Sequence, residues 1–276
     1  MAQADLHLHT IFSDGTETPE RVVELAARAG LSMIAITDHD NVEAFGRAQP
    51  VAQRRGIELL SGIELSSSAE HIEVHILGVL FDLRHAALQQ HLRRQQARRV
   101  ARVHEMVERL RRVGVTISAE EVLQLAGEGT VGRPHVARIL LKHGYVTSLS
   151  EAFARYIGGP EHPGFVPGST LLPAYVIRLV RDAGGIPILA HPVYLKRDAL
   201  IPGFVKDGLV GIEVYHPGHT PEMVRHYERL AEELGLLKSG GSDCHGDAKE
   251  GSPIGSVRVP VTLIDALKQW KLAQVH

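Results

Sequence analysis

The chain has 276 residues, of which 30 are Lys or Arg, 32 are Asp or Glu and 17 are His, so its formal charge is −2. This near-neutral balance excludes a globally basic nucleic-acid binder, and the single cysteine excludes internal disulfides and thiolate-rich zinc sites. The apolar fraction of 44% is typical of a globular core. Because there is no signal-peptide pattern and no apolar run near the roughly 18 residues of a membrane span, we expect a cytoplasmic protein that does not bind membranes.

Short apolar runs alternate with amphipathic stretches along most of the chain, a pattern that favours a parallel sheet or a β/α barrel. The runs lie near 4–9, 32–37, 57–64, 72–79, 186–190, 210–215 and 236–242. The first amphipathic stretch is a predicted helix that Thr18 caps, Pro19 begins and Gly30 ends. Seven candidate strands, and a length near the roughly 250 residues of such folds, favour the barrel.

One connection in this pattern is too short for a helix. Between Glu64 and the run at 72–79 there are fewer residues than the roughly 10–12 that a crossover connection needs. We therefore predict a hairpin that turns between Ala69 and Glu70. In that register Glu64 lies opposite His75, which brings two potential metal ligands together.

The segment 84–170 interrupts the alternation and has a helical pattern almost throughout. Its first part, 84–112, contains nine arginines and two glutamates. Ser118 and Glu121 form a possible capping box, Pro134 begins another predicted helix, and the Gly- and Pro-rich stretch 158–168 leads back to the barrel. We predict a barrel made of residues 1–83 and 171–276, with residues 84–170 as a helical insertion that binds substrate or acts as a lid.

Histidines and carboxylates follow the apolar runs repeatedly, at the end where β/α barrels form their active sites. They are His7 and His9, which share one face of the first strand, then Asp14, Asp38-His39-Asp40, Glu64, His191, His216 and Asp243-Cys244-His245. A single histidine at a strand end is usually only hydrogen-bonded. So many ionisable groups together are costly to bury unless a cation pairs with them, and imidazole and carboxylate ligands suit Zn, Mn or Fe.

The combination of these motifs resembles the PHP (polymerase and histidinol phosphatase) family. The matching residues are His7-x-His9, Asp14, Thr37-Asp38-His39, Glu64, His75, Ala190-His191-Pro192 and Asp243-x-His245. The resemblance implies a metal-dependent phosphoesterase on a distorted seven-stranded β/α (TIM-like) barrel with a helical insertion. The segments GRPHVARIL, GGIPILAHP and GIEVYHP look closer to one branch, whose members act on nucleoside 3′,5′-bisphosphates or on the 5′ ends of short RNA.

The resemblance also implies how the ligands are divided among two or three divalent ions. The first ion would be held by His7, His9, Glu64 and Asp243, the second by Glu64, His75 and His191, and the third by Asp14, His39 and His245. Some family members have a histidine where this chain has Asp14. A carboxylate there favours manganese, with zinc or iron as alternatives. We expect Asp38 and Asp40 to orient ligands or solvent, and Cys244 to be a packed thiol.

Several cationic residues are candidates for contacts with substrate. Arg133 and His135 lie in the GRPH turn, Lys196 and Arg197 follow His191, and His216 ends a strand. Arg133 is equally well explained by a salt bridge within the insertion. For His216 we favour substrate contact or a role as the acid that protonates the leaving oxygen, whereas ordinary loop charges explain Lys196 and Arg197 more simply. The arginine-rich stretch is either a solvated helix face or a patch for oligonucleotide phosphates.

The predicted reaction removes the 3′-phosphate of a nucleoside 3′,5′-bisphosphate through attack by a metal-bound hydroxide, and yields a nucleoside 5′-monophosphate and phosphate. Arg133 and His135 would hold the 5′-phosphate. Three alternatives remain: a 5′-3′ exoribonuclease acting on short 5′-phosphorylated RNA, a histidinol-phosphate phosphatase, and a non-catalytic metal-binding module. The expected partners are a small phosphorylated nucleotide or short RNA, with no obligate protein partner.

Overall fold

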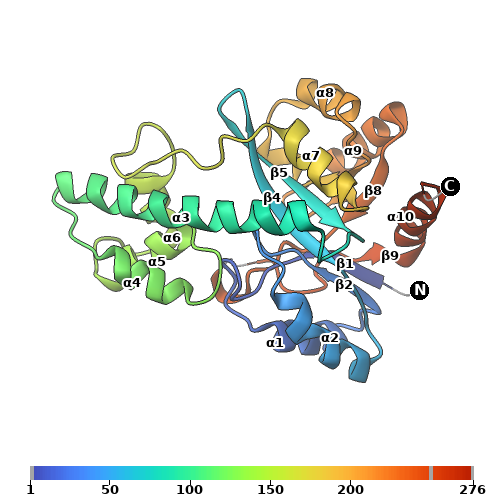
Figure 1. Cartoon of the computed structure of the whole chain (residues 1–276), viewed down its shortest axis with the longest axis horizontal. Coiled ribbons are helices and arrows are strands. Elements are labelled where there is room, and N and C mark those ends of the chain that lie inside the picture. Colours follow the sequence, from blue (N-terminus) through green and yellow to red (C-terminus); the bar gives the residue numbers. More distant parts are fainter. Residues whose placement is uncertain (1–2, 249–250, 275–276) are drawn as a thin grey trace.

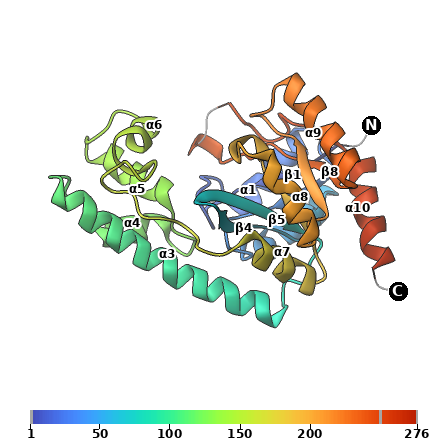
Figure 2. The same cartoon turned by 90° about the horizontal axis from the view of Figure 1, so that it is seen from above.

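The computed structural model describes residues 3–248 and 251–274, and its strands form two sheets (Figures 1 and 2). The smaller sheet has the order β3 (Glu58–Leu60), β2 (Met33–Ile36), β1 (Gln3–Leu8) and β9 (Val259–Pro260). The larger sheet has the order β4 (Gly62–Ala69), β5 (Ile72–Val79), β6 (Ile186–Leu189), β7 (Gly211–Tyr215) and β8 (Leu237–Gly240). Neighbouring strands are parallel except where β9, β4 and β5 are involved.

Helices pack on the outer faces of the sheets and fill the long segment between β5 and β6. The α-helices are α1 (Pro19–Arg28), α2 (Ala44–Arg55), α3 (Ala86–Arg112), α4 (Ala119–Ala126), α5 (Arg133–Lys142), α6 (Leu149–Ala152), α7 (Pro173–Asp182), α8 (Ile201–Lys206), α9 (Pro221–Leu234) and α10 (Val261–Ala273). The predicted start of α1 is confirmed, because the Thr18 hydroxyl accepts a hydrogen bond from the Arg21 N–H and Pro19 is the first helical residue.

Residues 3–248 and 251–274 contain nine strands in two sheets and no closed barrel, so the mixed α/β fold is confirmed but the predicted seven-stranded TIM-like barrel is not. The apolar run 57–64 comprises two strands, because the chain leaves the smaller sheet after β3 and enters the larger sheet at β4. Gly62 permits this step, since a Cβ there would lie 2.4 Å from the Ile36 carbonyl oxygen. The short strand β9, which no apolar run predicted, pairs antiparallel with β1.

The two sheets meet at two seams that lack continuous strand pairing. Single parallel bridges join Leu8 to Cys244 and His39 to Glu64. At the first seam the buried Asp5 carboxylate accepts a hydrogen bond of 2.9 Å from the backbone N–H of Ser242, so a side chain replaces part of a ladder. These contacts hold the carboxyl ends of β1, β2 and β8 close together at one edge.

The predicted hairpin is present as β4 and β5, but its register is shifted by two residues. Glu64 lies opposite Leu77 and not opposite His75. The turn residues are Glu70 and His71, both with positive φ (49° and 68°), as a two-residue turn of this kind requires. A shift of two residues keeps every side chain on its predicted face. Glu64 and His75 therefore still meet, with 2.8 Å between Glu64 Oε1 and His75 Nδ1.

The helix α3 belongs to two hydrophobic cores. Leu88 and Leu92 near its start pack in the core that α7 and the larger sheet share, whereas Met106 and Leu110 near its end pack with α4 and α5. Figures 1 and 2 show α3 running along the sheets and beyond them to α4, α5 and α6, which we call the helical lobe. The division into barrel and insertion at residues 84 and 170 stays a prediction.

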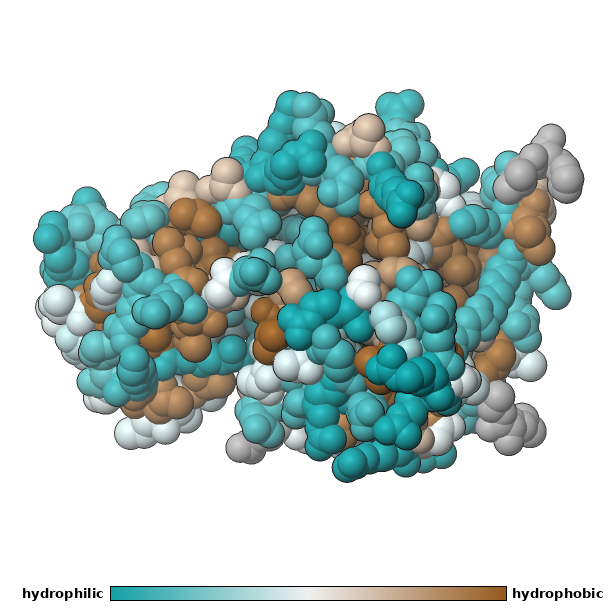
Figure 3. Space-filling model, turned by 60° about the horizontal axis from the view of Figure 1, so that its bottom comes forward, coloured by the Kyte–Doolittle hydropathy of each residue, from teal (hydrophilic) through white to brown (hydrophobic). Residues whose placement is uncertain are grey.

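The surface carries scattered apolar side chains, and some of them lie on or beside the helical lobe, on the left in Figure 3. Val113, Leu125 and Leu141 are examples of large apolar residues that are exposed there. In the described part of the chain, no helix is both long enough and apolar enough to cross a membrane.

Candidate active site

Nine side chains that the sequence assigns to metal binding lie together at one edge of the sheets. They are His7, His9, Asp14, His39, Glu64, His75, His191, Asp243 and His245, and we call them the cluster. Strands β1, β2, β6 and β8 deliver most of them at or just past their carboxyl ends, and the β4–β5 hairpin contributes Glu64 and His75. Each residue belongs to at least one group of three or four whose potential ligand atoms lie within 4.8 Å of one another.

These groups overlap more than the three sets that the family resemblance implies, in which Glu64 alone is shared between two ions. The groups are His9–Asp14–His39–His245, His7–His9–Asp243, His7–Glu64–His191 and His39–Glu64–His75. Four residues (His7, His9, His39 and Glu64) belong to two groups each. Neighbouring ions in such an arrangement would share ligands, as in sites with two metal ions.

Glu64 is the centre of the cluster and only 1% exposed. Five imidazoles contact its carboxylate, at distances of 3.2 Å for His7, 3.2 Å for His9, 3.3 Å for His39, 2.8 Å for His75 and 3.0 Å for His191. One carboxylate cannot neutralise five imidazoles if several are protonated, but its two oxygens can bridge cations that these imidazoles also bind.

Two further carboxylates stand at the sides of the cluster. Asp14 Oδ1 lies 3.3 Å from His245 Nε2, and Asp243 Oδ1 lies 3.3 Å from His9 Nε2 and 3.4 Å from His7 Nε2. The two imidazole nitrogens that Asp243 approaches also face Glu64, and His245 faces Asp14 with one ring nitrogen and Asp243 with the other. Carboxylate and imidazole donors that alternate around common points are the ligand set that divalent transition metals bind.

The cluster fits divalent ions because several of its buried donor atoms lack hydrogen bonds. Among the described residues these atoms include His9 Nε2, Asp14 Oδ1, His39 Nδ1 and both ring nitrogens of His75. Buried polar atoms are almost always hydrogen-bonded, because an unsatisfied one costs free energy. Their orientation toward other ligand atoms is explained if cations complete their coordination.

The pKa values of the histidines show how the cluster balances its charge with protons. Burial alone would lower the pKa of His75, but the charge of Glu64 raises it to about 10. Burial likewise opposes protonation of His9, yet the close carboxylates of Asp243 and Glu64 raise its pKa to about 9. For His39 burial dominates and lowers the pKa to about 4. Metal ions would displace the protons from His9 and His75 on binding.

Two residues of the cluster and one neighbour have a strained backbone. His191 and Asp243 have positive φ values of 25° and 48°, and Asp40, next to His39, has a φ of 49°. Residues other than glycine rarely adopt this region, and each such residue costs on the order of 1–3 kcal/mol. The strained backbone sets the direction in which the His191 and Asp243 side chains leave their strand ends.

The sequence analysis missed Glu213, a fully buried carboxylate on β7. Its Oε1 accepts a hydrogen bond of 3.1 Å from His7 Nδ1, and its Oε2 accepts one of 2.7 Å from the backbone N–H of His191. A carboxylate that binds the far nitrogen of a metal-ligating imidazole fixes its tautomer and orientation. The available signal was the charged residue inside the apolar strand GIEVY.

Asp38 and Asp40 face different partners. Asp38 accepts a 2.6 Å hydrogen bond from the Ser13 hydroxyl, whose oxygen lies 3.3 Å from His9 Nδ1, so it supports a cluster histidine indirectly. Asp40 instead forms a 2.6 Å ion pair with Arg99 of α3. The thiol of Cys244 is buried within a hydrophobic core, and burial raises its pKa.

The predicted substrate residues lie in three different environments. Arg133 forms a 2.5 Å ion pair with Glu73 of β5. Its salt bridge therefore joins the helical segment between β5 and β6 to the larger sheet, and does not lie within the predicted insertion. His216 is buried, with its Nε2 3.3 Å from Asp243 Oδ2. Lys196 is exposed in the loop after β6. The structure therefore brings His216 against the cluster and leaves Lys196 at the surface.

His135 is buried at the start of α5, where its Nδ1 accepts a hydrogen bond of 3.1 Å from the Gly132 N–H. That role requires an unprotonated Nδ1. Burial lowers the pKa of His135 from 6.5 to about 4, which the nearby Asp14 charge opposes only in part. His135 is therefore a neutral helix cap and not a cation for phosphate.

This pKa predicts how protein stability depends on pH. In the unfolded chain His135 becomes protonated below about pH 6.5, whereas in the folded chain it stays neutral down to about pH 4. The free energy of unfolding therefore decreases as the pH is lowered from 6.5 to 4. We expect His135 to account for a loss of about 2 kcal/mol between pH 7 and pH 5. Urea unfolding at both pH values measures it. His135→Gln keeps an acceptor for the Gly132 N–H without titrating and should show that much less pH dependence. Equal pH dependence in both proteins would contradict the assignment.

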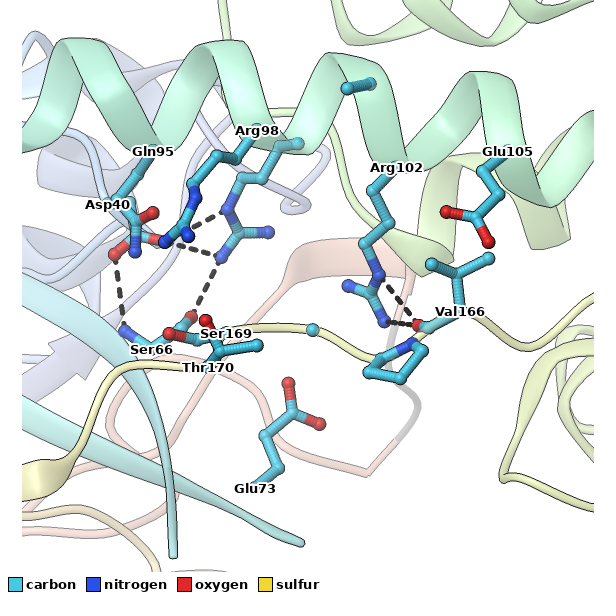
Figure 4. Close-up of a pocket in the computed structure, with 14 residues that line it drawn as sticks. Asp40, Ser66, Glu73, Gln95, Arg98, Arg102, Glu105, Val166, Ser169 and Thr170 are labelled. Carbon is cyan, nitrogen blue, oxygen red and sulfur yellow. Dashed lines mark hydrogen bonds and ion pairs between the residues drawn. The ribbon is translucent and has the colours of Figure 1, made fainter.

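A cavity of about 100 Å³ adjoins the cluster, and we call it the inner cavity. Asp14, His39 and His75 line it from the cluster, and Arg99, Arg102, Arg133 and Phe153 line it from the helical segment. An outer cavity of about 280 Å³ continues beneath α3 (Figure 4). The two cavities share Ser66, Glu73, Arg99 and Arg102 among their lining residues, so they adjoin.

More arginines than carboxylates line the inner cavity, namely Arg99, Arg102 and Arg133 against Asp14 and Glu73. Arg99 and Arg133 are each paired with a carboxylate, whereas the Arg102 guanidinium donates hydrogen bonds of 3.0 and 2.8 Å to the Val166 carbonyl oxygen (Figure 4). Burial, followed by the neighbouring Arg133 charge, lowers the pKa of Arg102 to about 10, which still leaves it charged at neutral pH. Among the described residues this partly enclosed guanidinium has a neutral carbonyl as its hydrogen-bond acceptor, which suits it to bind an anion.

Comparison with known proteins shows similarity along nearly the whole chain. The PHP domain family matches residues 5–156. A 5′-3′ exoribonuclease from Haemophilus influenzae is 34% identical, with 87% of this chain and 89% of that protein covered. A 3′,5′-nucleoside bisphosphate phosphatase from Chromobacterium violaceum is 31% identical, with 92% and 91% covered.

A solved structure has the same fold over almost its full length. It is a candidate metal-dependent phosphoesterase from Bifidobacterium adolescentis, with a TM-score of 0.88 and 33% sequence identity. The superposition covers 96% of this chain and 94% of the other. The arrangement of the two sheets is therefore shared with a solved protein.

Proposed function

This chain belongs to the PHP-domain family and is a metal-dependent phosphoesterase, and we propose that it removes the 3′-phosphate of nucleoside 3′,5′-bisphosphates. The relative from Chromobacterium violaceum carries that activity in its name. The products would be a nucleoside 5′-monophosphate and inorganic phosphate. Two or three divalent ions, with manganese favoured, would be held by the cluster, since Asp14 adds a hard oxygen ligand to the imidazoles.

The observation that carries the proposal is the inner cavity, which cluster residues and arginines of the helical segment line together. A substrate with two phosphates can place one at the cluster and the other at Arg102 and Arg133. This differs from the sequence-based expectation for His135, which caps α5 and is neutral. A phosphomonoester without a second phosphate would leave the Arg102 charge without an anion.

Each residue then has a defined task in hydrolysis. When bound, divalent ions lower the pKa of water and offset the negative charge of the phosphoryl group. Arg102 and Arg133 bind the 5′-phosphate and so fix the nucleoside relative to the cluster. Glu213 orients His7. His216 Nδ1 accepts a hydrogen bond from the Gly218 N–H. The ring proton of the neutral imidazole is therefore on Nε2, next to Asp243. We propose that His216 holds Asp243 in place through that proton or supplies it to the departing 3′-oxygen.

Removal of divalent ions provides a direct test of metal dependence. We expect dialysis against a chelator to abolish hydrolysis of adenosine 3′,5′-bisphosphate, and added Mn²⁺ to restore it, because the cluster has no other source of a nucleophile at neutral pH. Phosphate release and metal content, measured on the same sample, check this. Full activity in a sample free of metal would refute the mechanism.

A substrate panel tests the choice of substrate. Adenosine 3′,5′-bisphosphate, histidinol phosphate and a short 5′-phosphorylated RNA would be assayed side by side with the Mn²⁺-loaded protein. We expect the bisphosphate to give the highest kcat/KM. A preference for histidinol phosphate would reject the proposal, and no hydrolysis of any of them, with metal bound, would favour a binding module.

A 5′-3′ exoribonuclease is the second candidate, because the relative from Haemophilus influenzae is named so and matches over a similar length. The two activities need the same bond cleavage. In both, the bond between phosphorus and the 3′-oxygen of a 5′-phosphorylated nucleoside breaks. They differ only in whether the scissile phosphate is terminal or continues into RNA.

A further inference from the structure

Tyr194 is a half-exposed aromatic residue at the rim of the cluster that has no part in metal binding. It ends the short helix η2 (Pro192–Tyr194), which follows His191 directly, and it is 51% exposed. Its ring centroid lies 5.2 Å from that of His191 and 5.8 Å from that of His216. His191 belongs to the cluster and His216 contacts its Asp243, so a molecule bound there comes within reach of Tyr194.

The faces of the Tyr194 ring are not covered by a parallel ring among the described residues. The planes of the His191 and His216 rings are inclined to it by 54° and 87°. An exposed aromatic face beside a polar site is suited to stack on a planar ligand group. In a phosphorylated nucleotide that group is the nucleobase.

Tyr194 lies on a different side of the cluster from the inner cavity. The cavity touches the cluster at Asp14, His39 and His75, which come from the smaller sheet and the β4–β5 hairpin. Tyr194 adjoins the cluster through His191 and His216, which follow β6 and β7. If the 5′-phosphate of a nucleoside lies in the cavity and its 3′-phosphate lies at the cluster, the direction from the cavity across the cluster leads toward Tyr194. A chain that continues past the 3′-phosphate in that direction extends to the Tyr194 side.

We propose that Tyr194 stacks on the base of the second nucleotide of a short 5′-phosphorylated RNA, the nucleotide on the 3′ side of the scissile phosphate. This rests on the proposed function, because it uses the same site and the same bond cleavage. The oxygen of water bonds to phosphorus, the bond from phosphorus to the first nucleotide's 3′-oxygen breaks, and that oxygen leaves as a hydroxyl with a proton from water. The remaining RNA keeps the phosphate as its new 5′-phosphate.

The experiment compares two substrates that share the first nucleotide. One is adenosine 3′,5′-bisphosphate, and the other is the 5′-phosphorylated dinucleotide of adenosine, which carries a second base. For the Mn²⁺-loaded protein we measure the ratio of kcat/KM for the dinucleotide to kcat/KM for the bisphosphate. Because stacking on an aromatic side chain is worth about 1–3 kcal/mol per base, Tyr194→Ala should lower this ratio about tenfold, mainly through KM.

Three further variants define the role of the ring. Tyr194→Leu fills similar space without an aromatic face and should lower the ratio as Tyr194→Ala does. Tyr194→Phe keeps the face and should retain the wild-type ratio within about twofold, since stacking does not need the hydroxyl. Tyr175→Ala removes another half-exposed tyrosine, on α7 and outside both cavities, and serves as the matched control. Thermal melting checks that each variant is folded.

The outcomes separate this inference from the proposed function. A wild-type ratio in Tyr194→Ala and Tyr194→Leu would overturn the inference, and so would an equal loss in Tyr194→Phe. Hydrolysis of the bisphosphate without any cleavage of the dinucleotide would overturn it while the proposed function stands. If the wild-type protein with metal bound cleaves neither, both are wrong.

Discussion

Replacement of Glu64 by glutamine is expected to lower kcat/KM for adenosine 3′,5′-bisphosphate by at least about 10³-fold, because metal ions contribute several kcal/mol of charge stabilisation. Glu64 contacts five imidazoles of the cluster and can offer its two oxygens to more than one ion. Glutamine has nearly the same shape but no charge, and its amide nitrogen cannot bind a cation. Metal content after dialysis and steady-state hydrolysis measure the effect.

The control for this prediction is Glu222→Gln, which removes an exposed carboxylate on α9 that pairs with Arg225. It should keep wild-type metal content and turnover. Melting temperature distinguishes loss of metal from loss of fold, because the buried Glu64 is also the main acid that faces the cluster imidazoles. A folded Glu64→Gln protein with full metal content and full turnover would show that the cluster is not the active site.

Replacement of Arg102 by alanine is expected to raise KM for adenosine 3′,5′-bisphosphate about 10- to 100-fold, since a hydrogen bond to a charged group is worth about 1.5–3 kcal/mol. Adenosine 3′-monophosphate lacks the 5′-phosphate and should be hydrolysed with nearly unchanged kinetics. Arg102 lines both cavities, and its guanidinium is hydrogen-bonded to a carbonyl oxygen and not to a carboxylate. The comparison of the two substrates isolates the contact with the 5′-phosphate.

Two additional variants sharpen this comparison. Arg133→Ala should have a smaller effect than Arg102→Ala, because Arg133 already pairs with Glu73 and that pair must be weakened to bind phosphate. Arg112 is an exposed arginine at the end of the same helix, and Arg112→Ala should leave KM for both substrates unchanged. Equal losses on the bisphosphate and on the monophosphate would mean that Arg102 supports the structure of the cavity and does not bind the 5′-phosphate.

Local sequence patterns predicted the elements of this fold well and their assembly less well. The seven apolar runs all contain strands, because strand formation depends on short-range alternation and propensity. The predicted TIM-like barrel is not confirmed, because the way the strands assemble depends on long-range seams, where Asp5 bonds to Ser242 and Gly62 lies against Ile36. The hairpin register was wrong because the positive φ angles at Glu70 and His71, which set the turn, are not visible in the composition of the loop.

By itself the sequence determined which side chains gather at the active site and which reaction class they serve. The carboxyl ends of parallel strands lie at one edge of a sheet, whatever the order of the strands. The position of a histidine or carboxylate just after a strand is therefore enough to predict that it lies at this edge. Only the tertiary structure decided that His7, His9 and His39 also belong to two ligand groups each, that Glu213 supports His7, and that the Arg102 guanidinium donates to the Val166 carbonyl oxygen. These pairings join residues far apart in the chain, and they follow from how whole elements pack, which no local pattern encodes.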